Sequence, residues 1–381
     1  MHQLASRHVG LREPATRRWF AALAVATAPV TASPGPPRDD LFAAEISMAA
    51  DTTIASEEVT FSAGGRTIPG TLTHPRTGRG PALLILAGSG PTDRDWNSPL
   101  IPGKNGSAKQ LAESLAAQGV VVLRFDKSFS GKNGGPPLAA LTLDTYVAEA
   151  QAALALLKNR PEVDGKRVFV AGHSEGSIHV TRLALAERSG LRGVILLAGP
   201  GRSLRDVLIT QLAGNFRDAG KLPPDQVEAQ MKPIRDALAD FVAGKDVDPT
   251  SVSATPQVRM VFANLMAKPV AALGRALVSF EPVAEVAKLD IPVLVLQGGK
   301  DIQVDPVLDA EPLVASLRAA KRDVSYHLSP DANHVLKHEP RSVAEIRANL
   351  ATVTAGYGAE GIAVEPDVVK AILAWIRAKG K

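Results

Sequence analysis

The stretch Arg167–Glu187, RVFVAGHSEGSIHVTRLALAE, decides the fold. Residues Val168–Ala171 form a short apolar run, which predicts a strand buried on both faces. From Ser177 to Glu187 the pattern is helical. Gly172-His173-Ser174-Glu175-Gly176 stands between them and matches G-x-S-x-G. A strand, a sharp turn and a helix around this motif are what a nucleophile elbow requires, so Ser174 is the candidate nucleophile.

Strands and helices alternate on both sides of this stretch. Apolar or β-rich runs predict strands at Ala82–Leu86, Val120–Leu123, Arg167–Val170, Gly193–Leu197, Pro292–Leu296 and Val324–Leu328. Amphipathic patterns predict helices at Ser107–Gln118, Leu143–Lys158, Ser177–Glu187, Pro312–Ala320 and Asp367–Arg377. This alternation predicts an α/β fold, with a mostly parallel central sheet and helices on both faces.

One long run interrupts the alternation. From about Ser203 to Phe280 only helical patterns occur, and we expect residues 201–280 to form a helical cap. The core would then consist of residues 57–200 and 281–380. Its first element is an expected hairpin, in which Glu58–Phe61 and Thr67–Leu72 flank a Gly-Gly turn.

Residues 1–47 are not expected to join the fold. Arg17-Arg18 precede an apolar stretch, and Val30-Thr31-Ala32 resembles a cleavage site, which is the layout of an export signal. The alternatives are a disordered leader, or sequence upstream of a start at Met48 instead of Met1. A cytoplasmic location is favoured, and an exported or periplasmic one follows if residues 1–32 act as a signal peptide.

Composition excludes several classes of function. The net charge is +4, but residues 1–18 hold four arginines against one glutamate, so the rest is nearly neutral and nucleic-acid binding is rejected. The chain has no cysteine, which rules out disulfides and thiolate metal sites. No apolar run reaches the length of about 18 to 20 residues that a transmembrane helix needs. We therefore expect no transmembrane segment.

A serine nucleophile needs a base and a carboxylate that orients the base. Asp301 follows the strand ending near Leu296, and His334 follows the strand ending at Leu328. Carboxyl ends of parallel strands meet at one edge of a sheet, so we assign His334 as the base and Asp301 as its partner. Rival residues close by in the sequence are Asp305, Asp331 and His338.

The oxyanion of the tetrahedral intermediate needs hydrogen-bond donors. Gly88-Ser89-Gly90-Pro91 follows the first buried strand, and we expect the N–H groups of Ser89 and Glu175 to form this hole. Gly88 is expected to contact substrate. Arg202 and the side chain of Glu175 are expected at the rim of the pocket.

No cofactor or metal is expected. The glycine-rich segment lacks the third spaced glycine of a dinucleotide site, and no Walker lysine motif occurs. No histidine and carboxylate cluster has metal-ligand spacing.

The segment Leu86–Asp95, LAGSGPTDRD, resembles the G-S-G-P-x-D-R-D signature of a bacterial carboxylesterase subfamily within the α/β hydrolases. The G-x-S-x-G motif, Gly298–Asp301, Asn333-His334 and Arg124–Lys127 fit its other blocks, over about residues 57–380. The resemblance implies an α/β-hydrolase fold with a helical cap. It also implies hydrolysis of short acyl esters through an acyl-enzyme, without a cofactor.

The sequence departs from common patterns at two places. Ala87 stands where many α/β hydrolases have histidine, and Ser128–Gly131 follows Lys127 where a basic residue is often found. The expected partner is a small-molecule ester. A peptidase or aminopeptidase, an acyltransferase or lactonase, and a non-catalytic binding module remain open alternatives. The natural substrate, acyl length, stereochemical preference and oligomeric state are also left open.

Overall fold

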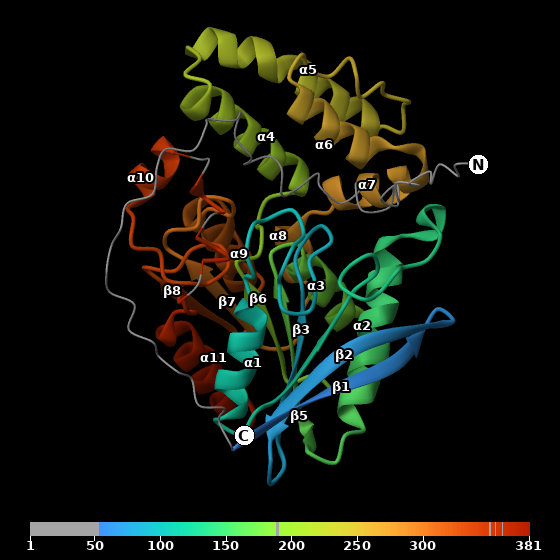
Figure 1. The fold of residues 1–381 in the computed structure, drawn as a ribbon, viewed down its shortest axis with the longest axis vertical. Helices are drawn as coiled ribbons and strands as arrows, with labels where there is room; N and C mark the ends of the chain where they lie inside the picture. The colour runs from blue at the N-terminus through green and yellow to red at the C-terminus, as the bar shows by residue number, and fades with distance from the viewer. Residues whose placement is uncertain (1–52, 188–189, 350–351, 355, 360) are drawn as a thin grey trace, which may run out of the picture.

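A computed structural model describes residues 53–381, except 188–189, 350–351, 355 and 360 (Figure 1). The predictions for residues 1–47, including the leader, the export signal and the alternative start at Met48, lie outside the described residues.

The centre of the molecule is an eight-stranded sheet with the order β1-β2-β4-β3-β5-β6-β7-β8. Its strands are β1 Ile54–Ala63, β2 Arg66–Pro75, β3 Gly80–Leu86, β4 Val121–Phe125, β5 Val163–His173, β6 Gly193–Leu197, β7 Val293–Gly298 and β8 Val324–Ser329. Strand β2 runs antiparallel to β1 and β4, and the pairs from β4 to β8 are parallel. The carboxyl ends of the parallel strands therefore lie along one edge.

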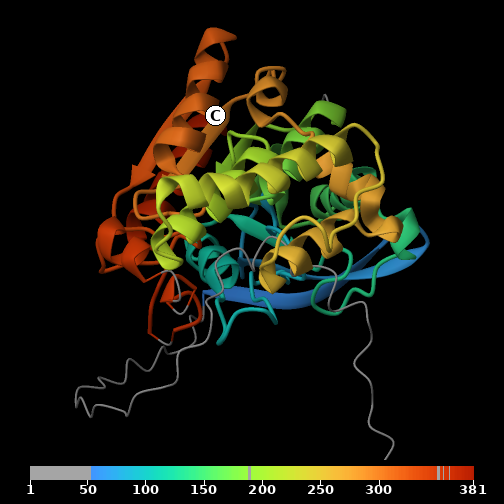
Figure 2. The ribbon, with the colours of Figure 1, turned by 90° about the horizontal axis from the view of Figure 1, so that it is seen from above.

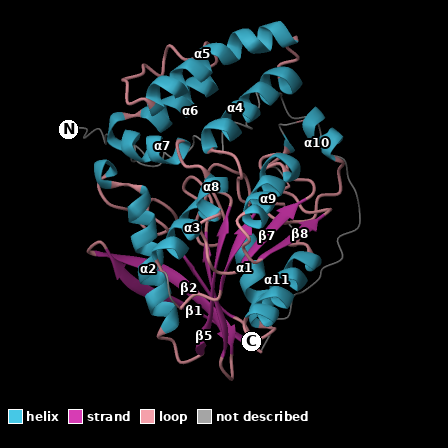
Figure 3. Cartoon of the chain, turned by 180° about the vertical axis from the view of Figure 1, so that it is seen from behind, coloured by secondary structure: helices cyan, strands magenta, loops and turns pink. Residues whose placement is uncertain are grey.

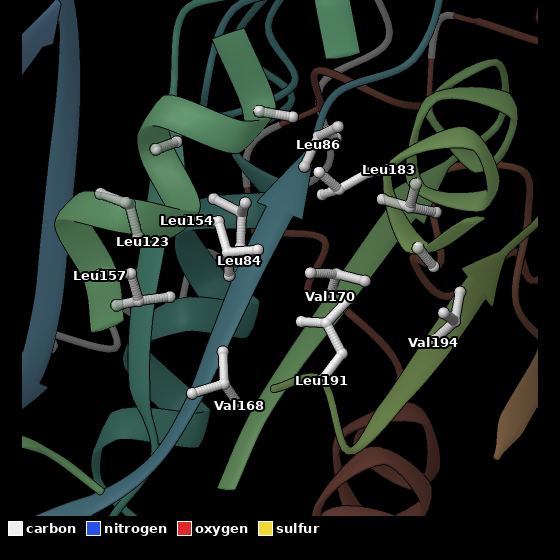
Figure 4. Packing of buried hydrophobic residues seen from close by; sticks show 14 of the residues in the cluster. Leu84, Leu86, Leu123, Leu154, Leu157, Val168, Val170, Leu183, Leu191 and Val194 are labelled. Carbon is white, nitrogen blue, oxygen red and sulfur yellow. The ribbon is translucent and has the colours of Figure 1, made fainter. Parts of the chain in front are cut away.

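In the central strands β3 to β7, alternate side chains enter two different cores. Leu84 of β3 and Val170 of β5 pack with helices α2 and α3 (Figure 4). Leu83 and Phe169, their neighbours in the sequence, pack with helices α1 and α11 on the opposite face. Because both faces are covered, the strands read as continuous apolar runs.

The covering helices complete three layers (Figure 3). One face carries α2 Leu143–Lys158, α3 Gly176–Ala186, α8 Pro282–Val286 and α9 Glu311–Ala319, and the other carries α1 Ser107–Ala116 and α11 Pro366–Lys379. The predicted α/β architecture, with a mostly parallel sheet between helices, is confirmed.

Five α-helices lie between β6 and β7, and all of them except α8 lie together beyond one end of the sheet (Figures 1 and 2). These four are α4 Leu204–Gly214, α5 Pro224–Val242, α6 Pro256–Met266 and α7 Ala271–Val278. Ile234, Leu238, Phe241 and Phe262 form an apolar cluster of their own there. No single helix in the described ranges is long and apolar enough to cross a membrane, although α6 and the segment Lys268–Val278 satisfy the test jointly as a pair bent by 53°.

Some short elements were not anticipated. Helix α8 and helix α10, Val343–Ala348, are the clearest cases, and single turns of 3₁₀ or π helix occur at Leu138–Ala140, Asn215–Ala219, Lys268–Val270 and Pro306–Ala310. After α10 the chain packs Val353 and Tyr357 against Val335 in a small apolar cluster. This segment forms one side of the site described next.

Candidate active site

Strand β5 delivers Ser174 to the carboxyl edge of the sheet. Ser174 has a φ of 53°, and α3 begins two residues later at Gly176. A Cβ on Gly172 would lie 2.1 Å from the carbonyl oxygen of Gly176, and a Cβ on Gly176 would lie 2.8 Å from that of Ala87. Both positions therefore require glycine. A non-glycine residue at such a φ costs about 1–3 kcal/mol, and local strain of this kind is common at functional sites.

An acid and a base meet beside this turn. The Nδ1–H of His334 donates to Oδ2 of Asp301 at 2.7 Å, and both side chains are buried. Oδ1 of Asp301 accepts the backbone N–H groups of Gln303 and Val304, at 2.8 and 3.0 Å. The amide of Gln297 donates to Oδ2 at 3.0 Å. These four donors hold the carboxylate in one orientation toward the imidazole.

The rivals named from the sequence lie elsewhere. Asp305 accepts the N–H groups of Val307 and Leu308 at the start of a helical turn. Asp331 is exposed and pairs with Lys300 at 2.8 Å. His338 is exposed and pairs with Glu365. None of these three lines the pocket that contains Ser174.

Ser174 and His334 line one pocket together with Gly88 and Ser89. Its apolar lining includes Trp96, Ile101, Leu204, Val207, Val335 and Tyr357. The cavity volume is about 80 Å³, room for about three water molecules at the roughly 30 Å³ that each takes in the liquid. Among the described residues that line the pocket, no side chain is Asp, Glu, Lys or Arg. The pocket thus suits a small, neutral and largely apolar group.

The loop after β3 passes close to the nucleophile. A Cβ on Gly88 would lie 3.2 Å from the Cβ of Ser174 and from the carbonyl oxygen of His173. Ser89 is held by Thr92, whose hydroxyl donates to the Ser89 carbonyl at 2.7 Å. Glu175 is buried at the start of α3, and its side chain faces away from the pocket lining toward His179. The backbone at Ser89 and at Glu175 therefore flanks Ser174 from two segments.

Charged residues fasten the outer part of this loop. The guanidinium of Arg94 donates to Asp126 at 2.9 Å, and Arg124 pairs with Asp95. Asp93 accepts the backbone N–H groups of Asp95 and Asn97, and burial raises the pKa of Asp93. The segment Thr92–Asp95 thus contributes ion pairs that shape the loop, and its charged side chains do not line the pocket.

Arg202 is not brought to the pocket. Its guanidinium donates to both oxygens of the buried Asp309, at 3.0 and 2.6 Å, and to Thr210. The pair links the segment before α4 to the turn after β7. Within the described chain, Arg202 therefore fastens the base of α4 and does not contact the pocket.

His173 is a pocket residue that the sequence reading did not assign. Its ring stacks on Trp96 with centroids 4.1 Å apart, and its Nε2–H donates to the His334 carbonyl at 2.8 Å. Burial lowers the pKa of His173 to about 3. Its adjacency to Ser174 was the one available signal. Trp96, Val207 and Tyr357 carried no such signal, because only folding brings them to the site.

One group of side chains has the geometry of a metal site. Ligand atoms of Glu57, His74 and Glu162 lie within 4.8 Å of one another. Glu162 precedes β5, so this group lies at the opposite end of the strand from Ser174. Arg160 already bonds both Glu57 and Glu162, which supplies their positive partner.

Comparison with known proteins shows the family to which the chain belongs and the fold that it shares. The sequence model of the family described as serine aminopeptidase, S33, matches residues 103–341. Esterase EstD of Thermotoga maritima is 29% identical over 271 residues, which are 71% of this chain and 58% of that protein. The chain thus spans less than two thirds of this relative.

Solved structures share the fold at low sequence identity. The complex of DcsB with its substrate analogue superposes with a TM-score of 0.51 at 15% identity, covering 85% of this chain and 99% of that one. The Pyrococcus furiosus esterase Pf2001 superposes with a TM-score of 0.50 at 16% identity, covering 86% and 94%. The predicted α/β-hydrolase fold is confirmed.

Proposed function

Because the chain belongs to the serine aminopeptidase S33 family of α/β hydrolases, we propose that it is a serine hydrolase that cleaves small carboxylic esters through an acyl-enzyme. The observation that carries the proposal is the buried His334–Asp301 hydrogen bond of 2.7 Å beside Ser174 in one pocket. The resemblance of Leu86–Asp95 to the G-S-G-P-x-D-R-D signature supports placement in that carboxylesterase subfamily.

The mechanism assigns one role to each group. Ser174 attacks the ester carbonyl while Nε2 of His334 takes the hydroxyl proton, and Asp301 stabilises the imidazolium through Nδ1–H. Backbone N–H groups of Ser89 and Glu175 bind the oxyanion. His334 then returns the proton to the leaving alcohol. Water repeats the sequence on the acyl-enzyme and releases the acid.

The lining of the pocket favours an ester over an aminopeptidase substrate. An aminopeptidase binds a protonated α-amino group, and a cation removed from water needs an opposing charge nearby. The described pocket lining offers no carboxylate for this purpose. Its apolar side chains instead suit the acyl part of a neutral ester.

We further propose that residues 201–280 act as a cap and choose the substrate, over a core formed by residues 57–200 and 281–380. Leu204, Val207 and Gln211 lie on one face of α4, at positions i, i+3 and i+7, and all three line the pocket. The amide of Gln211 donates to the Gln303 carbonyl at 3.1 Å, which connects α4 to the loop after Asp301.

Parallel assays on esters and amides test the function. The wild type is expected to hydrolyse p-nitrophenyl acetate and butyrate much faster than alanine or proline p-nitroanilide. Ser174→Ala is expected to lower ester turnover by at least about 10⁴-fold. Ser98→Ala, a serine in the same pocket without a role in the mechanism, should stay within about threefold. Full ester turnover by Ser174→Ala would overturn the proposal.

The same experiment separates the alternatives. Faster cleavage of the anilides than of the esters would favour a peptidase. Transfer of the acyl group to added alcohols, or faster turnover of lactones, would favour an acyltransferase or a lactonase. A binding module would leave Ser174 unlabelled by a fluorophosphonate, whereas a serine hydrolase is labelled there and the Ser174→Ala variant is not.

A further inference from the structure

Lys127 is buried beside the oxyanion loop, on the segment that follows β4. Its ammonium donates to the carbonyl of Gly90, the residue after Ser89. The same nitrogen lies 5.7 Å from the centre of the Tyr146 ring, on α2. A buried ammonium is costly unless fixed partners replace its water. We therefore ask what role a buried ammonium has beside the Gly88–Pro91 loop.

Three carboxylates act on Lys127, and two of them already have other cations. Glu149 accepts from Arg66 at 2.9 Å, and Asp126 accepts from Arg94 at 2.9 Å. Glu175 accepts the Nε2–H of His179 at 3.3 Å, and the His179 ring lies 4.7 Å from the Tyr146 ring that the Lys127 ammonium faces. Among these acids Glu175 exerts the largest effect on the pKa of Lys127, which burial lowers.

The position of Glu175 makes its charge important. Glu175 is the residue after Ser174, and its backbone N–H is one of the two proposed oxyanion donors. Burial acts to raise the pKa of Glu175, but the hydrogen bond and charge of His179 and the charge of Lys127 hold it below its ordinary value. An ionised carboxylate on the residue next to Ser174 opposes the negative charge that develops in the transition state.

We propose that Lys127 is a positioning residue of the oxyanion hole, which holds the Gly88–Pro91 loop through the Gly90 carbonyl and balances the buried Glu175 carboxylate. The ammonium of Lys127 thereby acts on both segments that supply the proposed oxyanion donors, the loop after β3 and the start of α3. The inference rests on the proposed function, because it concerns the oxyanion of that reaction.

The test compares two lysines of one loop. Lys127→Met removes the ammonium but keeps a side chain of similar length. It is expected to lower kcat for p-nitrophenyl butyrate by about 10- to 100-fold, somewhat less than the loss of an oxyanion donor, with KM within about threefold. The matched control is Lys132→Met, whose side chain is 75% exposed, and its kcat should stay within about twofold. Turnover is counted per active site, by complete fluorophosphonate labelling.

A second substitution separates charge balance from general damage. Adding Glu175→Gln to Lys127→Met removes the unbalanced carboxylate and should restore at least about fivefold in kcat, which a merely structural defect would not do. Wild-type kcat in a folded Lys127→Met variant would overturn the inference, and so would a double variant without recovery. If Lys127→Met does not fold, Lys127→Gln, which also removes the charge, replaces it alone and in the double variant under the same criteria: a reduced kcat that Glu175→Gln partly restores supports the inference, and wild-type kcat in Lys127→Gln overturns it.

The two proposals fail in different ways. If ester hydrolysis by the wild type persists in Ser174→Ala, the proposed function fails. If hydrolysis depends on Ser174 but not on Lys127, only this inference fails.

Discussion

His173 donates its Nε2–H to the main-chain carbonyl of His334 across 2.8 Å, with the two rings 4.8 Å apart. A carbonyl oxygen only accepts, so the proton of the neutral His173 ring resides on Nε2. The residue before the candidate nucleophile thus holds the backbone of the candidate base. This contact joins the end of β5 to the loop after β8, which lie far apart in the sequence.

The neutral state of His173 predicts an acid-sensitive stability. Burial lowers its pKa to about 3 in the folded protein, whereas in the unfolded chain it titrates near 6.5. Between these values the unfolded state binds one more proton, so stability falls as the pH falls, by about 1.4 kcal/mol per pH unit from this group. Urea denaturation at pH 7, 5.5 and 4.5 measures the free energy of unfolding of the wild type and of His173→Phe. The difference between the two values should become less favourable to the wild type as the pH falls. The same pH dependence in both proteins would contradict this prediction.

The carboxylate that serves His334 can be identified by two matched substitutions. Asp301→Asn keeps the size of the side chain but removes the charge that stabilises the imidazolium, so kcat for p-nitrophenyl butyrate should fall by about 10³- to 10⁴-fold. Asp305→Asn should stay within about threefold, because asparagine also caps a helical turn. A larger loss at Asp305 than at Asp301 would reverse the assignment.

The tight turn at Ser174 predicts that alanine substitutions at two glycines of β5 differ strongly in their effect on stability. A Cβ on Gly172 would lie 2.1 Å from the Gly176 carbonyl oxygen, while a Cβ on Gly165 meets nothing within 4 Å. Gly172→Ala should lower the free energy of unfolding by more than about 3 kcal/mol. Gly165→Ala should change it by less than about 1 kcal/mol. Urea denaturation measures both, and equal effects would mean that the tight turn is not needed.

Substitution of Val207 on α4 is expected to change the acyl chain length that the enzyme prefers. Val207 is buried and lines the pocket, so Val207→Ala makes room for a longer acyl chain. The ratio of kcat/KM for p-nitrophenyl hexanoate over butyrate should rise about tenfold, since one methylene in an apolar pocket is worth about 1–3 kcal/mol. Arg205→Ala, on the same helix but outside the pocket lining, is the control. If the hexanoate-to-butyrate ratio is unchanged in Val207→Ala, α4 does not determine the preferred acyl length.

Most elements of the sheet could be predicted from the sequence, because a strand covered on both faces is apolar at successive positions. The expected helix Leu143–Lys158 and strand Gly193–Leu197 have the same bounds in the structure. Strand β5 is longer than predicted, since its first half, with Asp164 and Lys166, is polar. Helix α10 was missed, although Ser342 and Glu345 form a capping box at its start.

The sequence by itself determined the succession of strands and helices along the chain, the turn at Ser174, and a few candidate acids and bases. These features follow from local periodicity, from the placement of glycines and from the order of motifs in the chain. Only the tertiary structure decided that Asp301 and not Asp305 faces His334, that His173, Trp96 and Val207 line the pocket of Ser174, and that Lys127 contacts the Gly90 carbonyl. Such contacts depend on strand order and side-chain packing across many residues of chain, and no local pattern encodes them.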